Sequence, residues 1–436
     1  MLENNGNLAA ITEDTIKQRM ATLGIEESEL QGITLSIDNG VKVQQNQTGT
    51  NSSTITNTGV SLVNYKIYGN SIQNGVPTPE SPVEIQSVGD KTKNLFNQFT
   101  TKTASFSAVS NSSARTFEEG VWYRGLTYNN YSYPQNLLDY NVGTSTTMVK
   151  VNGQLLYGLA QAFKVEPKQI YSFSYDGGEG GNVALGFYDK EGKILSYKYW
   201  TYGSTINIPA NAYWMTICLS GSTANIEISY SNIQLVLGTE STSYEPYGYK
   251  IPIKVTTDGN TTLHNIYLAE PLRKLGEEKD YIDFEKGQIV RKIGKAVYDE
   301  NSNWTLQSAS YWFESGVTTA FYTQIPVDAL ANSQGLECLS NLFKFDSTSD
   351  GINKSKPYIS GNIGNLVVNF NNEKVSSLEQ LETYLTQTKL EIVYKLNSPV
   401  YKNIKLPGIY TTKGTTSIAI DTEISPSEFV LNYEYK

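Results

Sequence analysis

Residues 169–189 read QIYSFSYDGGEGGNVALGFYD, two runs of alternating apolar and polar residues on either side of a glycine-rich turn. Side chains of a strand point alternately to its two faces, so this pattern predicts a half-buried strand on each side of the turn. Lys190-Glu191-Gly192 then predicts a hairpin with a further strand at 193–197. Similar short runs recur every roughly 8–12 residues from about 94 to 246, without a helical period. We therefore expect a β-sandwich or jelly roll in this region.

The composition of the 436-residue chain favours folded β-structure and disfavours nucleic-acid binding. Hydrophobic residues make up 39% of the chain, which is enough to build cores and excludes global disorder. Tyrosine is the most frequent aromatic residue, with 31 copies, and aromatic residues are enriched in strands. The 34 basic and 43 acidic residues give a net charge of −9, whereas binding to a phosphate backbone needs a concentrated basic surface. We therefore expect no nucleic-acid partner.

Two segments carry a helical rather than a strand pattern. The first runs from Thr12 to Gly24 and has acidic residues in its first turn and one narrow apolar stripe. The second lies near 377–388, where Ser377 can cap the helix and leucines recur at helical spacing. The fold class expected is mainly β, with several β-sandwich or jelly-roll domains, a short N-terminal helical segment and one short helix near 377–388.

Cysteine and histidine are too few for a metal centre or a disulfide framework. Cys218 and Cys338 lie far apart in the chain, and His264, the only histidine, lies in an alternating strand pattern. A structural zinc site needs four clustered ligands, so we expect no metal site, and no glycine-rich cofactor motif is found. We expect two free, buried cysteines rather than a disulfide, and a strand histidine rather than a catalytic base.

Acidic residues gather at one predicted hairpin, namely Asp280, Asp283 and Glu285. Two carboxylates at a suitable separation can hydrolyse glycosidic bonds. The segment also fits a half-solvated hairpin that turns at Lys286-Gly287, with Arg291 and Lys292 as counter-charges. We therefore expect structural roles for these acids and no enzymatic activity. The loop 176–181 offers oxygen ligands to a cation, but its two acids fall short of a calcium site.

Aromatic rings outside the core are candidates for sugar binding, because an aromatic face can stack on the weakly polar C–H face of a sugar. The candidates within 94–246 are Trp122, Tyr123, Trp200, Tyr202 and Trp214. In the run 213–219, the residues expected to face the core are Tyr213, Met215, Ile217 and Leu219. Trp214 is then expected to point away from the core. The alternative is that these rings line the core or a contact between subunits.

Four further stretches of sequence belong together. They are 69–90 (GNSIQNGVPTPESPVEIQSVGD), 232–247 (NIQLVLGTESTSYEPY), 267–294 (YLAEPLRKLGEEKDYIDFEKGQIVRKIG) and 390–399 (LEIVYKLNSP). These stretches resemble the minor structural proteins of tailed bacteriophages that infect Gram-positive bacteria, of the tail or baseplate receptor-binding type. The second stretch resembles the closing strand of a jelly roll of the carbohydrate-binding-module kind. The resemblance covers most of the chain after about residue 62.

The resemblance implies a domain organisation that residue spacing alone does not show. Residues 1–60 have no part in the resemblance; their helical pattern favours a helical or extended attachment segment, whose apolar stripe packs either on this chain's β-domain or on another subunit. The resemblance implies that 61–93 together with 247–297 form a discontinuous β-domain. Residues 94–246 would be an inserted carbohydrate-binding-like jelly roll, and 298–436 a C-terminal β-domain with one short helix. A sandwich whose ends lie close together can be inserted into a surface loop with little distortion.

The resemblance also implies a virion structural protein of the tail tip or baseplate that attaches to the host through weak, multivalent binding of cell-wall polysaccharide. Its other partners would be further virion proteins and copies of itself, as a trimer or a symmetric ring. It would assemble in the host cytoplasm and act outside the host cell. No apolar run approaches the ~18–20 residues of a membrane span. The alternatives are a purely structural virion component, such as a head fibre or tail scaffold, and a glycan-degrading enzyme.

Overall fold

The computed structural model describes most of the chain between residues 34 and 431. The described residues are 34–37, 41–45, 52–58, 65–97, 103–105, 116–124, 146–150, 159–179, 181–221, 227–240, 242–257, 259–313, 316–330, 337–346, 356–362, 364–371, 374–409 and 413–431. Strands dominate these ranges, and α2 (Leu378–Gln387) is the helix among them. The expected mainly β fold class is therefore confirmed.

The chain forms two compact units. Unit 1 comprises Met1–Gly89, Ile251–Asn265 and Pro271–Lys436, and unit 2 comprises Asp90–Lys250 with Ile266–Glu270. Unit 2 contains the whole of the range expected to be an insertion. The ranges expected as separate domains on either side of it lie mostly together in unit 1, whereas residues 90–93, 247–250 and 266–270 belong to unit 2.

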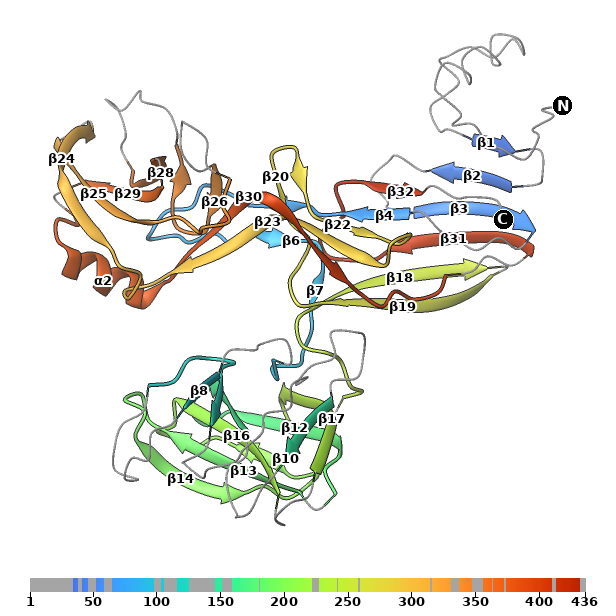
Figure 1. The fold of residues 1–436 in the computed structure, drawn as a ribbon, viewed down its shortest axis with the longest axis horizontal. Coiled ribbons are helices and arrows are strands. Elements are labelled where there is room, and N and C mark those ends of the chain that lie inside the picture. Colours follow the sequence, from blue (N-terminus) through green and yellow to red (C-terminus); the bar gives the residue numbers. More distant parts are fainter. Residues whose placement is uncertain are drawn as a thin grey trace, which may run out of the picture. The chain divides into compact units, whose positions relative to one another are not determined.

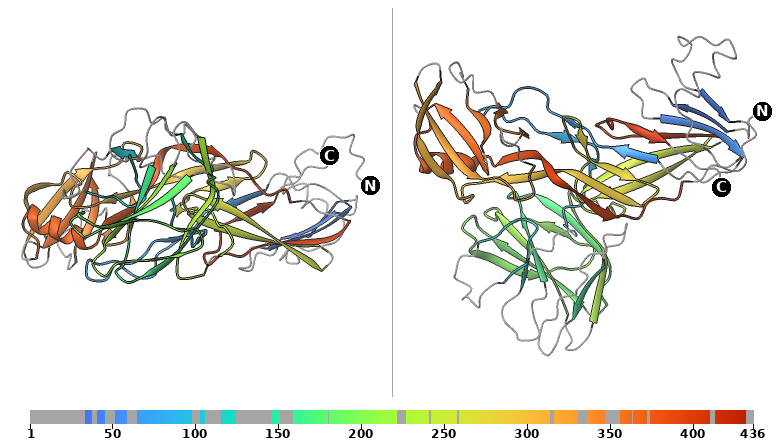
Figure 2. Two further views of the ribbon diagram at one scale, coloured as in Figure 1. Left: turned by 90° about the horizontal axis from the view of Figure 1, so that it is seen from below. Right: turned by 45° about the horizontal axis from the view of Figure 1, so that its top comes forward.

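Unit 2 is a sandwich of two sheets (Figures 1 and 2). One sheet has the order β10 (Thr146–Lys150), β17 (Glu227–Leu237), β12 (Ile170–Gly177) and β15 (Thr205–Asn207). The other has the order β14 (Ile194–Tyr199), β13 (Gly181–Tyr188), β16 (Trp214–Gly221), β11 (Leu159–Lys164), β9 (Trp122–Arg124) and β8 (Thr103–Ser105). Neighbouring strands are antiparallel except β8 and β9, which are parallel. The β-sandwich expected here is therefore confirmed.

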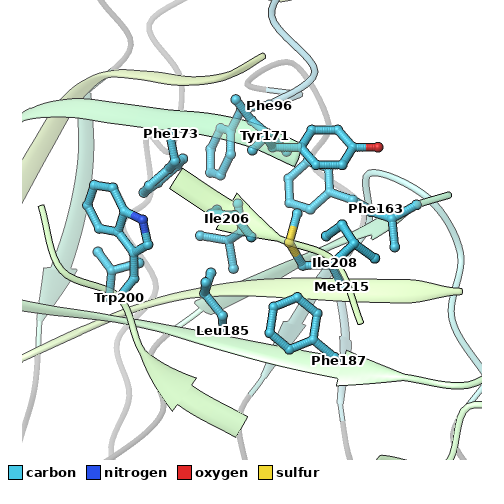
Figure 3. Packing of buried hydrophobic residues seen from close by; sticks show 14 of the residues in the cluster. Phe96, Phe163, Tyr171, Phe173, Leu185, Phe187, Trp200, Ile206, Ile208 and Met215 are labelled. Atoms are coloured by element: carbon cyan, nitrogen blue, oxygen red, sulfur yellow. The ribbon is translucent and has the colours of Figure 1, made fainter. Parts of the chain in front are cut away.

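The core of unit 2 lies between these sheets (Figure 3). In β12 the buried residues Tyr171 and Phe173 alternate with more exposed neighbours, and β13 contributes Leu185 and Phe187 to the same cluster. The alternation in 169–189 thus places one face of each strand in the core. Burying a side chain of this size contributes roughly 1.5–3 kcal/mol, so these positions hold the sheets together.

Asn94 closes the point where the chain enters and leaves the sandwich. Its Nδ2 donates hydrogen bonds to the backbone oxygens of Ile233 (3.0 Å) and Glu245 (2.9 Å). Its Oδ1 accepts from the backbone nitrogens of Phe96 (2.9 Å) and Leu235 (3.1 Å). All four hydrogen-bonding positions of this buried amide are used, so one side chain ties both ends of the inserted range together.

Unit 1 has three larger sheets among its described residues (Figure 1). The first has the order β1 (Thr34–Ile37), β2 (Val41–Gln45), β3 (Ser52–Thr58), β31 (Lys413–Ile420), β18 (Tyr249–Thr257) and β19 (Asn260–Leu268). β7 (Asp90–Lys91) belongs to unit 2 and pairs with Tyr249 and Lys250, the residues of β18 that also belong to unit 2. The second has the order β26 (Cys338–Ser340), β30 (Leu390–Asn403), β23 (Gln288–Tyr298), β22 (Tyr281–Asp283), β4 (Tyr65–Tyr68) and β32 (Phe429–Leu431). The third has the order β24 (Thr305–Phe313), β25 (Gly316–Gln324), β29 (Asn365–Asn371), β28 (Tyr358–Asn362) and β27 (Lys344–Phe345).

Two short two-stranded sheets complete the described strands. They pair β5 (Ser71–Ile72) with β6 (Gln86–Ser87), and β20 (Lys274–Leu275) with β21 (Glu278–Lys279). β18 and β19 carry residues of both units, because the boundaries at 250/251 and 265/266 fall within them. The chain therefore passes from one unit to the other within a strand at two points, once in β18 and once in β19.

The helix near the C-terminal end is confirmed, with bounds one residue inside those expected. The Oγ of Ser377 accepts a hydrogen bond from the backbone nitrogen of Gln380 (3.3 Å), and Leu381 and Leu385 are buried. The helix expected at Thr12–Gly24 lies outside the described residues. No helix in the described part of the chain is long and apolar enough to cross a membrane.

The acidic hairpin is present, but the expectation that it is half-solvated is wrong for two of its acids. β22 and β23 pair around Gly287, which has a φ of +59°. Asp280 and Asp283 are buried, with 0% and 1% exposure. The carboxylate of Asp280 accepts four hydrogen bonds of 2.8–3.0 Å, from the backbone nitrogens of Arg273, Lys292 and Ile293 and from Nη1 of Arg291. These donors compensate the loss of hydration, which is why a charge is tolerated there.

Candidate functional site

Tyr202 is presented by a tight turn between β14 and β15. The backbone nitrogen and the Oγ of Ser204 both donate to the backbone oxygen of Thr201, at 3.0 and 2.6 Å. Gly203 has a φ of +78°, a conformation that glycine adopts without steric cost. The sequence Thr-Tyr-Gly-Ser therefore closes a turn that leaves the Tyr202 side chain 64% exposed.

Tyr202 is the exposed end of a continuous aromatic cluster. Its ring meets that of Tyr175 edge to face, with centroids 5.4 Å apart and an interplanar angle of 80°. It meets Trp200 at 5.8 Å and 68°, and Trp200 in turn lies edge-on to the buried ring of Phe173 at 5.0 Å and 79°. Such contacts contribute about 0.5–1.5 kcal/mol each beyond burial. The exposed ring is therefore attached to the rigid core of the sandwich.

Trp200 belongs to the core, which corrects the expectation that it is an outward platform. It is 8% exposed and packs beside Phe173 between the two sheets (Figure 3). Its Nε1 donates to the backbone oxygen of Ser204 (3.0 Å), which gives the buried indole the partner it needs. Trp200 directly follows the exposed Tyr199 at the end of β14, so strand alternation did not fix its direction. Its role is to position Tyr202.

Trp214 lies on the face of its sheet opposite the main core, as alternation predicts. The residues of β16 that do join the main core are Met215, Ile217 and Leu219. The Trp214 ring is half-buried and lies 5.7 Å from the ring of Phe117. Trp214 packs against a small second cluster with Val121, Ala162 and Tyr188, so it is not an open platform.

Tyr213 does not join the core, which corrects the expectation for that residue. It precedes β16 and is half-buried. The ammonium groups of Lys164 and Lys190 lie 5.8 and 6.0 Å from its ring centroid. The alternation of this segment therefore begins only at Trp214, where the ladder with the neighbouring strands starts.

Trp122 and Tyr123 lie in β9, where they pair with Gln161 and Ala160 of β11. Their side chains lie outside the described part of the structure, so their role in sugar binding stays a prediction. Of the five candidates, the structure brings Trp200 and Tyr202 together and places Trp214 in a separate cluster.

A carboxylate and an amide lie next to the aromatic cluster in the chain. Asp176 follows Tyr175, and its Oδ2 accepts a hydrogen bond from Nδ2 of Asn232 (2.6 Å). Asn232 has a φ of +50° at a bulge between β12 and β17. Its Oδ1 has no hydrogen-bond partner within the described residues. Because that oxygen is buried, the exposed group of this pair is the Asp176 carboxylate.

Sequence reasoning missed Tyr175 and Tyr230, although the glycine-rich loop is a signal for them. A Cβ on Gly178 would lie 2.7 Å from the Tyr230 ring and 2.8 Å from the Tyr175 ring. Gly178 also has a φ of +77°, so no other residue fits without strain. The absence of a side chain at Gly178 leaves room for both rings. Their centroids lie 5.1 Å apart and the rings are nearly perpendicular.

Burial raises the pKa of several tyrosine and cysteine side chains. The pKa of Tyr175 and that of Tyr230 are both raised, so both rings stay neutral at physiological pH. Neither Cys218 nor Cys338 forms a disulfide and both are buried, as expected, and burial raises the pKa of Cys218 to about 12. A buried, protonated thiol is a poor nucleophile. Within the described ranges no three Asp, Glu, His or Cys side chains are grouped to hold a metal ion.

No family model, curated protein or solved structure matches this chain. What the protein does is therefore inferred from its own residues.

Proposed function

We propose that this protein is a structural component of a bacteriophage virion, at the tail tip or baseplate, and that unit 2 binds host cell-wall carbohydrate. The observation that carries sugar binding is the exposed ring of Tyr202, held by Tyr175 and Trp200. A fixed aromatic ring offers a face on which the apolar side of a sugar can stack without a large loss of rotamer entropy. The virion assignment is supported by the sequence resemblance of 69–90 and 232–247.

Hydrogen bonds would have to supply what stacking alone lacks. The exposed carboxylate of Asp176, which follows Tyr175 in the chain, can accept hydrogen bonds from sugar hydroxyls in addition to the one from Asn232. One exposed ring and one carboxylate offer a small contact area, so each site would bind weakly. Several copies in a trimer or ring, engaging one polysaccharide together, would convert weak sites into firm adhesion. The mechanism is non-covalent.

The alternative is a purely structural virion component, such as a head fibre or tail scaffold. The burial of Trp200 and the packing of Trp214 favour it, because two of the five candidate rings serve the fold. Tyr202 would then contact another virion protein. A glycan-degrading enzyme gains no support from the acidic hairpin, where Asp280 is fully engaged by protein donors and Asp283 lies 3.5 Å from the Lys66 ammonium.

Binding of the full chain to purified wall polysaccharide of Gram-positive cells tests the proposal. Tyr202→Ala is expected to weaken binding about tenfold, the equivalent of one lost aromatic contact of roughly 1.4 kcal/mol, while the chain stays folded. The matched control is Leu195→Ala, an exposed apolar residue of β14 that should bind like the native chain. Equal binding by Tyr202→Ala would exclude this site. Absence of binding by the native chain would favour the scaffold alternative.

A further inference from the structure

A second group of aromatic side chains crosses a sheet of unit 1. Strand register places Tyr401 of β30 opposite Val290 of β23, Val290 opposite Tyr281 of β22, and Tyr281 opposite Tyr68 of β4. Directly opposed residues project to the same face of a sheet, so these four side chains form one row across four strands. We call Tyr68, Tyr281 and Tyr401 the tyrosine row. Strands are spaced about 4.8 Å apart, so Tyr281 and Tyr401 lie roughly 10 Å apart along it.

Two of the three rings are already covered by cations. The rings of Tyr68 and Tyr281 pack at a centroid distance of 5.3 Å. The ammonium of Lys279 lies 4.6 Å from the Tyr68 centroid, and that of Lys66 lies 5.2 Å from the Tyr281 centroid. Tyr401, in contrast, is 59% exposed. The free aromatic surface of the row is therefore at its Tyr401 end.

A pair of amide side chains flanks Tyr401. Gln288 and Asn403 are opposed in the same ladder, two residues along their strands from Val290 and Tyr401, and so lie on the same face. Nε2 of Gln288 donates to Oδ1 of Asn403 (2.9 Å) in an exposed hydrogen bond. The Gln288 carbonyl oxygen and the Asn403 amino group take no part in that bond. The pair can therefore offer a ligand one acceptor and one donor.

The charges around the tyrosine row cancel one another. Lys292 pairs with Glu278 (2.9 Å), Lys66 with Asp283 (3.5 Å), and Lys279 with Glu428. The pKa of Lys292 is raised chiefly by its hydrogen bond to Glu278, with smaller contributions from Tyr281 and Tyr401. A face with balanced charges does not select a highly charged polymer.

We propose that Tyr401, Gln288 and Asn403 form a binding site for chains of N-acetylated amino sugars, separate from the Tyr202 site of unit 2. The sugar ring would stack on Tyr401. The acetamido group carries one N–H donor and one carbonyl acceptor, which complement the amide pair. A stable protein partner needs about 800 Å² of buried surface on each side with an apolar centre, whereas this face has one open ring among paired charges. An oligosaccharide fits such a surface better than a protein does.

Titration calorimetry of the full chain with a hexamer of β-1,4-linked N-acetylglucosamine tests the site. The matched ligand is the β-1,4-linked glucose hexamer, which lacks the acetamido groups. Tyr401→Ala should weaken binding of the first hexamer about tenfold, and Tyr401→Phe should retain it because the ring remains. Gln288→Ala should reduce the preference for the acetylated hexamer. Val400→Ala, the exposed neighbour that points to the other face, should bind like the native chain.

The same titrations separate this site from the Tyr202 site. Loss of binding in Tyr401→Ala with native-like binding in Tyr202→Ala would support the inference. Loss in Tyr202→Ala alone would assign the hexamer to unit 2, which overturns the inference and leaves the proposed function standing. Equal affinity of native chain and Tyr401→Ala, or no affinity of the native chain for the hexamer, would also overturn it.

Discussion

The ring of Tyr202 lies at 80° to the ring of Tyr175, and the Tyr202 hydroxyl donates a hydrogen bond to the backbone oxygen of Tyr175 (3.3 Å). One residue thus restrains both the tilt and the outer end of the exposed ring. A ring with few accessible rotamers loses little entropy when a ligand stacks on it. In the proposed sugar site, Tyr175 would therefore be a positioning residue and would not offer the stacking surface itself.

Tyr175→Leu removes the ring contact and keeps an apolar side chain, while the backbone oxygen that accepts the hydrogen bond from the Tyr202 hydroxyl remains. We expect wall polysaccharide to bind about threefold to tenfold more weakly, because about 0.5–1.5 kcal/mol of ring contact is lost and Tyr202 gains freedom. The binding assay, with urea unfolding as the check on stability, measures both effects. Unchanged affinity in a folded Tyr175→Leu protein would mean that Tyr202 needs no positioning partner.

Substitutions of Trp200 and Tyr202 are expected to have different main effects. Trp200→Ala should chiefly lower the stability of unit 2, and Tyr202→Ala should chiefly weaken polysaccharide binding. Trp200→Ala should lower the free energy of unfolding by about 3–5 kcal/mol, because it leaves a cavity in the core of unit 2. Tyr202→Ala should lower it by less, about 1–2 kcal/mol, because the side chain is 64% exposed and only its contacts with Tyr175 and Trp200 are lost. Urea titrations followed by tryptophan fluorescence and circular dichroism measure the difference. Similar losses from both substitutions would contradict the assignment of Trp200 to the core and Tyr202 to the surface.

The alternation of apolar and polar residues was sufficient to predict the sandwich, because alternation depends only on the local geometry of a strand. The strands on either side of the 176–181 loop and the capped helix after Ser377 lie where local rules place them. Alternation at Met215 and Ile217 also assigned Trp214 correctly to the opposite face. Each of these features is decided by residues within a few positions of one another.

Long-range contacts decided the features that the sequence did not reveal. Trp200 is buried because its indole packs on Phe173 and donates to the turn at Ser204, neither of which follows from the alternation in β14. Asp280 is buried because donors from residue 273 and from residues 291–293 converge on it. A carboxylate in a hairpin is exposed by default. Only the structure shows that hydrogen bonds from these donors replace the water that would otherwise hydrate the Asp280 carboxylate.

Asp280 is expected to be a principal contributor to the stability of unit 1. Asp280→Asn places an amino group where only acceptors fit and leaves the Arg291 guanidinium without its counter-charge, so we expect a loss of about 3–5 kcal/mol. Glu278→Gln, two residues earlier in the chain in β21, is the matched control. It removes a half-exposed ion pair with Lys292 and should cost no more than about 1 kcal/mol. Chemical denaturation distinguishes them, and a small effect of Asp280→Asn would show that the four donors find other partners.

Cys218 is expected to make the stability of unit 2 fall at alkaline pH. It is buried with Ala160 and Ala184, and burial raises the pKa of its thiol from 9.0 to about 12. A group whose pKa is higher in the folded state stabilises the fold fully below its unfolded pKa. That stabilisation is lost as the pH rises from about 9 towards 12, because the unfolded chain releases the proton first. One such proton contributes up to about 1.4 kcal/mol per pH unit.

Cys218→Ala tests this origin, because alanine is small and apolar like its two neighbours in the cluster. The free energy of unfolding, measured from pH 8 to 10.5, should decline less steeply in Cys218→Ala than in the native chain. Native protein at pH 8 should also leave Cys218 unmodified by an aromatic disulfide reagent, whereas denatured protein should react, since only the exposed thiolate is nucleophilic. Rapid labelling of Cys218 in the native state, or parallel pH profiles for the two proteins, would show that the thiol is not held in the dry interior that raises its pKa.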